Sequence, residues 1–201
     1  MAILSCDPQS GRKIRASALR AARHAGIFMV VLAASASGAQ GQVTADQIKA
    51  AYMFNFAKFI EWPAEALADT ASLNFCALGR SAAVDEVDSL VSGKSINNRP
   101  IKIRHLGKPE EIKDCHLVFL ADSAGKQEQK LFQAAKGLPI LLVGESPGFA
   151  HAGGTIGFLT ENGKVLFEVN ISSAEEAHLK ISSKLLALAR IVSSGIARTG
   201  Q

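Results

Sequence analysis

Nearly every position between Ile48 and Trp62 is apolar. Eleven of these fifteen residues are apolar, and the four polar ones fall at scattered angles around a helix rather than in one stripe. The capping box Thr44-x-x-Gln47 predicts that the helix begins near Ala45, and Pro63 predicts that it ends at Trp62. A helix that is apolar on almost all sides buries one face in its own core and lays another against a loop, a second copy or a partner.

Short aliphatic runs alternate with helix-forming segments in the next part of the chain. The runs predict strands, and the segments between them predict two helices: strands over Leu73–Leu78, Pro100–Leu106, His116–Ala121 and Pro139–Val143, helices over Ala82–Val91 and Lys126–Lys136. Near-continuous aliphatic strands suit a parallel sheet that is covered on both faces. We therefore predict an α/β fold with a mostly parallel, Rossmann-like sheet and crossover helices.

The pattern changes after the fourth strand. Asn162-Gly163 lies between two alternating runs, Thr155–Thr160 and Val165–Ile171, and predicts an antiparallel hairpin at the end of the sheet. The last predicted element is a long helix over Ser173–Ala197, capped by Ser172-x-x-Glu175. Its apolar stripe consists of Ile181, Leu185, Leu188 and Val192. The chain has no internal repeat and no linker, so we predict a single domain.

The positive charge of the chain is concentrated at its N-terminus. The formal net charge is +4, but five basic residues lie in the first 24 positions and are followed by the uncharged run Ala25–Ala36 and the small residues Ser37-Gly38-Ala39. This pattern is typical of a secretory signal peptide, and we predict that residues 1–39 are removed and that residues 40–201 form the domain. The alternative is an uncleaved N-terminal anchor, although a bilayer span takes about 20 apolar residues. The remaining residues carry as many acidic as basic side chains, so charge gives no reason to expect nucleic-acid binding.

Export changes the interpretation of the cysteines. Cys76 and Cys115 remain after the leader is removed, and a pair of cysteines normally forms a disulfide in an oxidising compartment. A bond that closes a loop of this length would stabilise the fold by roughly 4 kcal/mol in the chain-entropy model. The alternative is two buried thiols that pack as small apolar groups. A metal site is disfavoured, because only His116 lies near either cysteine.

The chain carries no convincing catalytic motif. Gly144–Gly148 matches the G-x-S-x-G nucleophile elbow, but Ser146 is followed by Pro147, which lacks the N–H that an oxyanion hole needs. The glycine pair Gly153-Gly154 leads into a predicted strand and not into a phosphate-binding helix. Gly163-Lys164 does not have the spacing of a P-loop. We therefore expect no enzyme activity, no catalytic residue and no cofactor.

The turn Gly79-Arg80-Ser81 is the better candidate for binding an anion. It connects a predicted strand to a helix and places a basic residue at the carboxyl end of a parallel strand. Such turns occur in every doubly wound sheet, so the motif alone is not specific. It supports the alternative of an exported small-ligand-binding protein that uses Arg80, Ser81 and the loop after Ala121.

Several segments together resemble the YfiR family of periplasmic proteins. They are the helix Lys49–Pro63, the pair Cys76 and Cys115, the segment Gly148–Ile171 and the segment His178–Ala189. The resemblance implies a periplasmic α/β domain, a disulfide between the two cysteines, frequent dimers and sensitivity to the redox state of the envelope. Some members have a second disulfide, which this chain lacks because it has no cysteine between residues 144 and 160.

The resemblance also implies a function. The best-studied members of the family repress an inner-membrane diguanylate cyclase of the YfiN type by contacting its periplasmic region, which limits cyclic-di-GMP and biofilm formation. We expect this chain to bind such a sensor, or another sensory membrane protein, through Met53, Ile60 and Trp62 on an exposed face of the first helix. The opposite face would hold the helix on the sheet. The alternatives are that the loops over residues 64–72 and 144–154 cover this face, that the protein binds a small ligand, or that it is an exported hydrolase.

Overall fold

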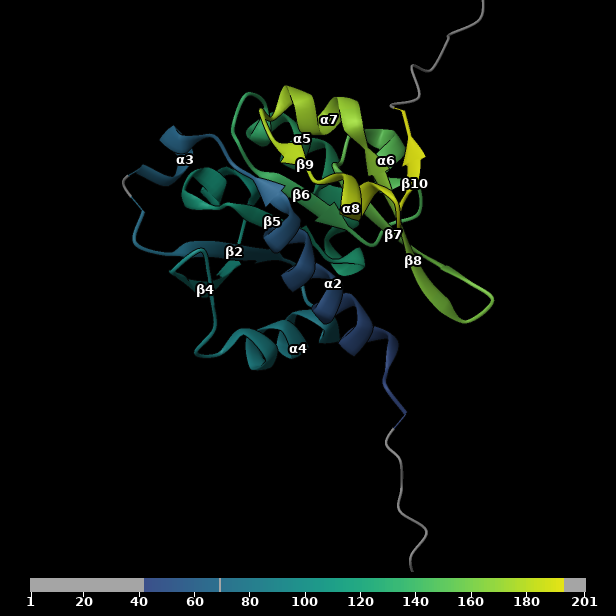
Figure 1. Cartoon of the computed structure of the whole chain (residues 1–201). Coiled ribbons are helices and arrows are strands. Elements are labelled where there is room, and N and C mark those ends of the chain that lie inside the picture. Colours follow the sequence, from purple (N-terminus) through teal and green to yellow (C-terminus); the bar gives the residue numbers. More distant parts are fainter. Residues whose placement is uncertain (1–41, 69, 194–201) are drawn as a thin grey trace, which may run out of the picture. The chain divides into compact units, whose positions relative to one another are not determined.

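A mixed sheet organises residues 42–68 and 70–193, which are the residues that the computed structural model describes (Figure 1). Eight strands in this part of the chain pair in the order β10-β8-β7-β6-β5-β2-β4-β3. They are β2 (Leu73–Leu78), β3 (Ser95–Ile96), β4 (Arg99–Leu106), β5 (Leu117–Leu120), β6 (Leu141–Gly144), β7 (Ile156–Glu161), β8 (Lys164–Asn170) and β10 (Arg190–Val192). The predicted signal peptide over residues 1–39 lies outside the described residues.

Most neighbouring strands of the sheet are parallel. The run from β7 through β6, β5 and β2 to β4 is parallel throughout, while β8 is antiparallel to β7 and β3 is antiparallel to β4. The hairpin between β7 and β8 turns at Asn162 and Gly163, which both have positive φ angles, of 50° and 74°. These observations confirm the predicted α/β fold, its mostly parallel sheet and its antiparallel hairpin.

Helices cover both faces of the sheet. They are α2 (Ala45–Phe59), α3 (Ala64–Ala68), α4 (Ala82–Val91), α5 (Glu128–Ala135), α6 (Phe149–Ala152), α7 (Ile171–Glu176), α8 (Ser183–Leu186) and the 3₁₀ helices η1 (Pro109–Asp114) and η2 (Asp122–Gln127). Successive residues of β2 point to opposite faces: Phe75 and Ala77 join one core cluster with α2 and α4, while Cys76 and Leu78 join a second with η1 and α5. The buried strands therefore read as continuous apolar runs, as the sequence predicts.

The two cysteines form the predicted disulfide within the second cluster. Cys76 lies in β2 and Cys115 precedes β5, and their Cα atoms are 5.9 Å apart. Both side chains are buried, with 2% and 4% of their surface exposed. The bond thus links two parallel neighbours in the middle of the sheet.

The first helix starts as predicted and ends earlier. The side chain of Thr44 accepts from the backbone N–H of Gln47, and the side chain of Gln47 accepts in return from the N–H of Thr44. The helix ends at Phe59, and not at Trp62. The next two residues form β1 (Ile60–Glu61), which pairs antiparallel with β9 (Lys180–Ile181). Strand β9 lies far from β1 along the chain, so the local sequence pattern does not predict this pairing.

The predicted long C-terminal helix over Ser173–Ala197 is wrong. Helix α7 begins earlier, because the side chain of Asn170, and not Ser172, accepts from the N–H of Ser173. It ends at Glu176, and His178 adopts a left-handed backbone with φ of 55°. The chain then forms β9, α8 and β10 in succession, and the last predicted residues, 194–197, lie outside the described residues.

The glycine-rich segment before β7 makes room for an aromatic ring. Phe149, in α6, is only 1% exposed, and its ring lies against Gly144 and Gly154. A Cβ at Gly144 would lie 2.5 Å from this ring, and one at Gly154 would overlap it even more closely. The glycines are therefore explained by packing.

Candidate functional site

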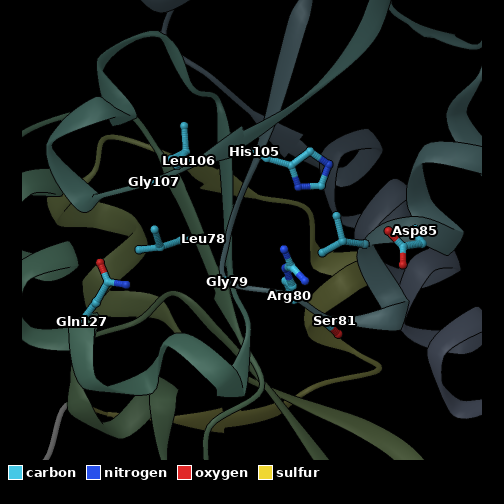
Figure 2. A pocket seen from close by; sticks show the side chains of 10 residues that line it. Leu78, Gly79, Arg80, Ser81, Asp85, His105, Leu106, Gly107 and Gln127 are labelled. Atoms are coloured by element: carbon cyan, nitrogen blue, oxygen red, sulfur yellow. The ribbon is translucent and has the colours of Figure 1, made fainter.

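A polar crevice of about 660 Å³ opens at the carboxyl ends of β2 and β4 (Figure 2). We call it the Arg80 crevice. It is lined by the turn after β2 with the start of α4, by the end of β4 and by η2: Leu78–Ser81, Val84, Asp85, His105–Gly107 and Gln127. The structure thus places both Arg80 and Ser81, the predicted ligand-binding residues, at one cavity.

The turn that carries Arg80 is fixed by the loop after β5. The hydroxyl of Ser123 accepts from the backbone N–H of Arg80 and donates to its carbonyl oxygen, both at 2.9 Å. Gly79 has φ of +90°, and a Cβ there would lie 2.7 Å from the Cβ of Ala124. The turn at Arg80 and the loop after Ala121 therefore lie together, as the sequence predicts.

The crevice borders the point at which the connections of the sheet change direction, between β2 and β5, and Gln127 reaches it from the β5 side. The chain leaves β2 through α4 and reaches β4 on one side, and it leaves β5 through α5 and reaches β6 on the other side. Strands β2 and β5 are parallel neighbours, so their outgoing loops separate at the carboxyl edge. Ligands of open α/β sheets bind at such topological switch points.

The polar side chains of the crevice are largely unpaired. The side chains of Arg80, Asp85, His105 and Gln127 make no hydrogen bond or ion pair with any described residue. Figure 2 shows the Arg80 guanidinium near the middle of the lining residues, with His105 and Asp85 to one side and Gln127 to the other. The hydroxyl of Ser81 accepts from the N–H of Ala83 and caps α4. Ser81 thus has a structural role, while Arg80 is available for a ligand.

Sequence reasoning missed His105, Asp85 and Gln127. His105 lies near the end of β4, and the register pairs it with Ala77 in β2. The predicted parallel pairing of these two strands could have placed His105 near Arg80, because the carboxyl ends of parallel neighbours meet at one edge of the sheet. Gln127 could not be placed in this way, because it follows β5 by several residues.

A second cavity, of about 450 Å³, is lined by charged residues that are already paired. Lys49 in α2 forms an ion pair with Glu145, with 2.6 Å between Nζ and Oε2. The other carboxylate oxygen of Glu145 accepts from the backbone N–H of Asp122. Across the cavity, Glu168 lies 3.7 Å from His151. The Lys49–Glu145 pair therefore holds α2 on the loop after β6. Within the described residues, no group of three or more His, Cys, Asp or Glu side chains is placed to hold a metal ion.

The structure contradicts the predicted exposed face of the first helix. Met53 and Ile60 are 2% and 3% exposed and belong to the core cluster. Helices α4 and α8 and strand β8 lie against α2, so its flanks are covered from within the domain. The side chains that the prediction assigned to a partner therefore pack against the protein's own elements.

Trp62, the third predicted contact, is half-buried against a histidine. Its indole N–H donates to the backbone carbonyl of His116 at 3.3 Å, and the two rings meet edge to face. The ring of His116 is buried, and its Nδ1 accepts from the N–H of Asn74 at 3.1 Å. Burial lowers the pKa of His116, an effect that the carbonyl of Ala66 opposes and the charge of Arg99 reinforces. His116 is therefore a packed, neutral residue that joins β2, β5 and the segment after α2.

The sequence matches the model of one protein family. A family model described as YfiR/HmsC-like matches residues 46–190, which run from the first turn of α2 to the first residue of β10. The chain belongs to the YfiR/HmsC-like family. No curated protein matches the chain.

A solved structure resembles the YfiR/HmsC-like domain in fold. An ABC domain from Streptococcus pneumoniae in complex with L-Trp aligns with a TM-score of 0.51 and 9% identity, over 73% of this chain and 60% of that one. A conserved domain protein from Vibrio cholerae O1 biovar El Tor aligns with a TM-score of 0.49 and 10% identity, over 71% and 59%. The chain therefore spans about three fifths of the length of each. In the described residues, no helix has the length and apolar character needed to cross a membrane.

Proposed function

We propose that this YfiR/HmsC-like protein is an exported repressor that binds the periplasmic region of an inner-membrane diguanylate cyclase. Binding restrains the cyclase and lowers cyclic-di-GMP and biofilm formation in the cell. The family match over residues 46–190 carries this proposal, because it spans almost the whole described domain. The protein acts by binding and not by catalysis.

The buried disulfide supports a role outside the cytosol. Disulfides persist in oxidising compartments such as the periplasm, and this one crosses the middle of the sheet. The basic and apolar leader pattern of residues 1–39 agrees with export.

We place the contact with the cyclase at the β10 edge of the sheet. Among the described residues, β10 is the edge strand next to β8, so one side of its backbone has no strand partner there. Leu188, just before β10, is 71% exposed, and Ile191 in β10 is 48% exposed. Exposed apolar side chains beside an open strand edge suit a protein partner. This assignment replaces the buried residues Met53 and Ile60.

Affinity capture from the envelope tests the proposal. The tagged full chain is expressed in its host, crosslinked, and the captured proteins are identified by mass spectrometry. We expect an inner-membrane protein with a diguanylate cyclase domain. Leu188→Glu with Ile191→Glu should abolish its capture. Val43→Glu, a control before α2 at a residue that is 68% exposed, should retain it.

Two results would count against the proposal. If the wild-type chain captures no membrane sensor, the proposed repressor function is wrong. If the cyclase is captured equally well by the Leu188→Glu, Ile191→Glu variant, the function stands and the β10 contact is wrong. Circular dichroism of each variant keeps a folding defect from being mistaken for lost binding.

A further inference from the structure

The Arg80 crevice contains a positive charge without a partner. Arg80 is exposed, and the hydroxyl of Ser123 hydrogen-bonds both its backbone N–H and its carbonyl oxygen. Its guanidinium makes no ion pair within the described residues. By contrast, Arg104 pairs with Asp114 at 3.7 Å, and Arg190 pairs with Glu161 at 2.9 Å. A fixed backbone with a free guanidinium is prepared to bind a carboxylate or a phosphate, which match its planar donors.

The remaining lining of the crevice limits what the ligand can be. Leu78, Val84 and Leu106 contribute apolar side chains, and His105 and Gln127 contribute polar groups without partners in the described residues. Asp85 lines the same crevice and repels a ligand that carries several negative charges. A volume of about 660 Å³ is within the usual range for small-molecule sites.

We propose that the Arg80 crevice binds a small organic anion with one anionic group, a carboxylate or a phosphate ester. The anionic group pairs with Arg80, a donor of the ligand reaches Asp85, and the rest of the ligand packs on Leu78 and Leu106. The position beside a topological switch point also favours a ligand site. This inference goes beyond the proposed repressor function and does not depend on it.

The second cavity is a weaker candidate for the same chemistry. Its lysine, Lys49, is bound to Glu145 at 2.6 Å, and a new anion would have to displace that carboxylate. Glu168 adds a further negative charge to its lining. The free cation of the Arg80 crevice therefore makes it the better anion site.

Titration followed by amide NMR tests the proposal on the mature protein. One arm uses acetate and the other uses inorganic phosphate, each at constant ionic strength and with chloride as the reference. We expect saturable shifts of the amides from Arg80 to Ala83 and from His105 to Gly107 in at least one arm, and the responding arm identifies the anionic group. Arg80→Gln should weaken the binding of that probe at least about tenfold, as expected for a lost charged hydrogen bond.

Matched variants separate a site from general charge attraction. Arg104→Gln removes the same charge from the neighbour of His105 in β4, where successive side chains point to opposite faces, and should leave binding unchanged. Asp85→Asn should strengthen the binding of acetate, because acetate has no donor for Asp85 and the substitution removes a negative charge from the crevice. The proposal is overturned if neither probe gives saturable shifts, or if Arg80→Gln and Arg104→Gln weaken binding equally. Neither result bears on capture of the cyclase, so the two proposals fail separately.

Discussion

Trp62 donates its indole N–H to the backbone carbonyl of His116, at a distance of 3.3 Å. The same histidine accepts on Nδ1 from the N–H of Asn74 and contacts the hydroxyl of Thr70 through Nε2. Arg99 donates to the carbonyl of Thr70, which places a cation near the ring. The segment after α2 is therefore fastened to the start of β5 through the backbone carbonyl and the buried, neutral ring of His116.

This arrangement predicts that acid destabilises the fold. The pKa of His116 is lowered from its ordinary value of 6.5, chiefly by burial, so the folded state favours the neutral ring. The contribution of His116 is complete above pH 6.5 and is lost as the pH falls towards the lowered value. Urea unfolding at a series of pH values should show that the free energy of unfolding falls more steeply with decreasing pH in the wild type than in His116→Gln. Equal slopes would contradict this prediction.

The Cys76–Cys115 bond predicts a large response to reduction. Its loop spans 39 residues, so Cys115→Ser should lower the free energy of unfolding by about 4 kcal/mol in the chain-entropy model. Denaturant unfolding with and without reductant measures this loss. The double variant Cys76→Ser, Cys115→Ser serves as control and should not respond to reductant. Two free thiols in non-reducing mass spectrometry of the wild type would refute the bond.

The contact between Phe149 and Gly154 predicts an overpacked variant. Gly154→Ala forces a methyl group into the Phe149 ring and should cost about 1–3 kcal/mol. Phe149→Leu in the same chain should recover part of that loss. Gly107→Ala is the control, because its nearest contact would be Glu111 at 3.8 Å. Thermal unfolding of the four proteins tests the contact, and equal midpoints for Gly154→Ala and Gly107→Ala would disprove it.

The ion pair between Lys49 and Glu145 predicts coupling between α2 and the loop after β6. Both side chains are mostly buried, at 17% and 12% exposure, so Lys49→Met leaves a carboxylate without its cation. We expect a double-mutant cycle with Glu145→Gln to give a coupling energy of about 1–3 kcal/mol. Glu65→Gln, at an exposed residue of α3 with no ion pair among the described residues, provides the control. Additive effects of the two substitutions would show that the pair is not coupled.

Local signals in the sequence predicted what depends on local chemistry. The capping box at Thr44, the hairpin at Asn162-Gly163 and the apolar run of β2 are each recognised within a few residues, and the structure confirms each of them. The disulfide also followed from two cysteines and an export signal.

Contacts between residues that are distant along the chain could not be predicted in the same way. Ile60 leaves the helical pattern because it pairs with Ile181, and that pairing also interrupts the predicted C-terminal helix. The stripe of that helix is dispersed in the structure, since Leu185 is buried and Leu188 is 71% exposed. Met53 is covered by other distant residues, since it packs in the core cluster with residues of β2, α4 and β5.

The sequence predicted one part of the candidate site and not the other. Arg80 followed from a basic residue in a strand-to-helix turn, while Asp85, His105 and Gln127 required the order of strands in the sheet. The two hydrogen bonds between Ser123 and the backbone of Arg80 involve a side chain from the neighbouring loop, so no local sequence pattern predicts them.

Cyclic-di-GMP measured in the host after deletion of the gene tests the central claim most directly. The proposed repressor function predicts that cyclic-di-GMP and biofilm rise on deletion and return on complementation with the wild-type chain. Complementation with Leu188→Glu and Ile191→Glu together should fail although the protein folds and is exported. Unchanged cyclic-di-GMP in the deletion strain would contradict the account.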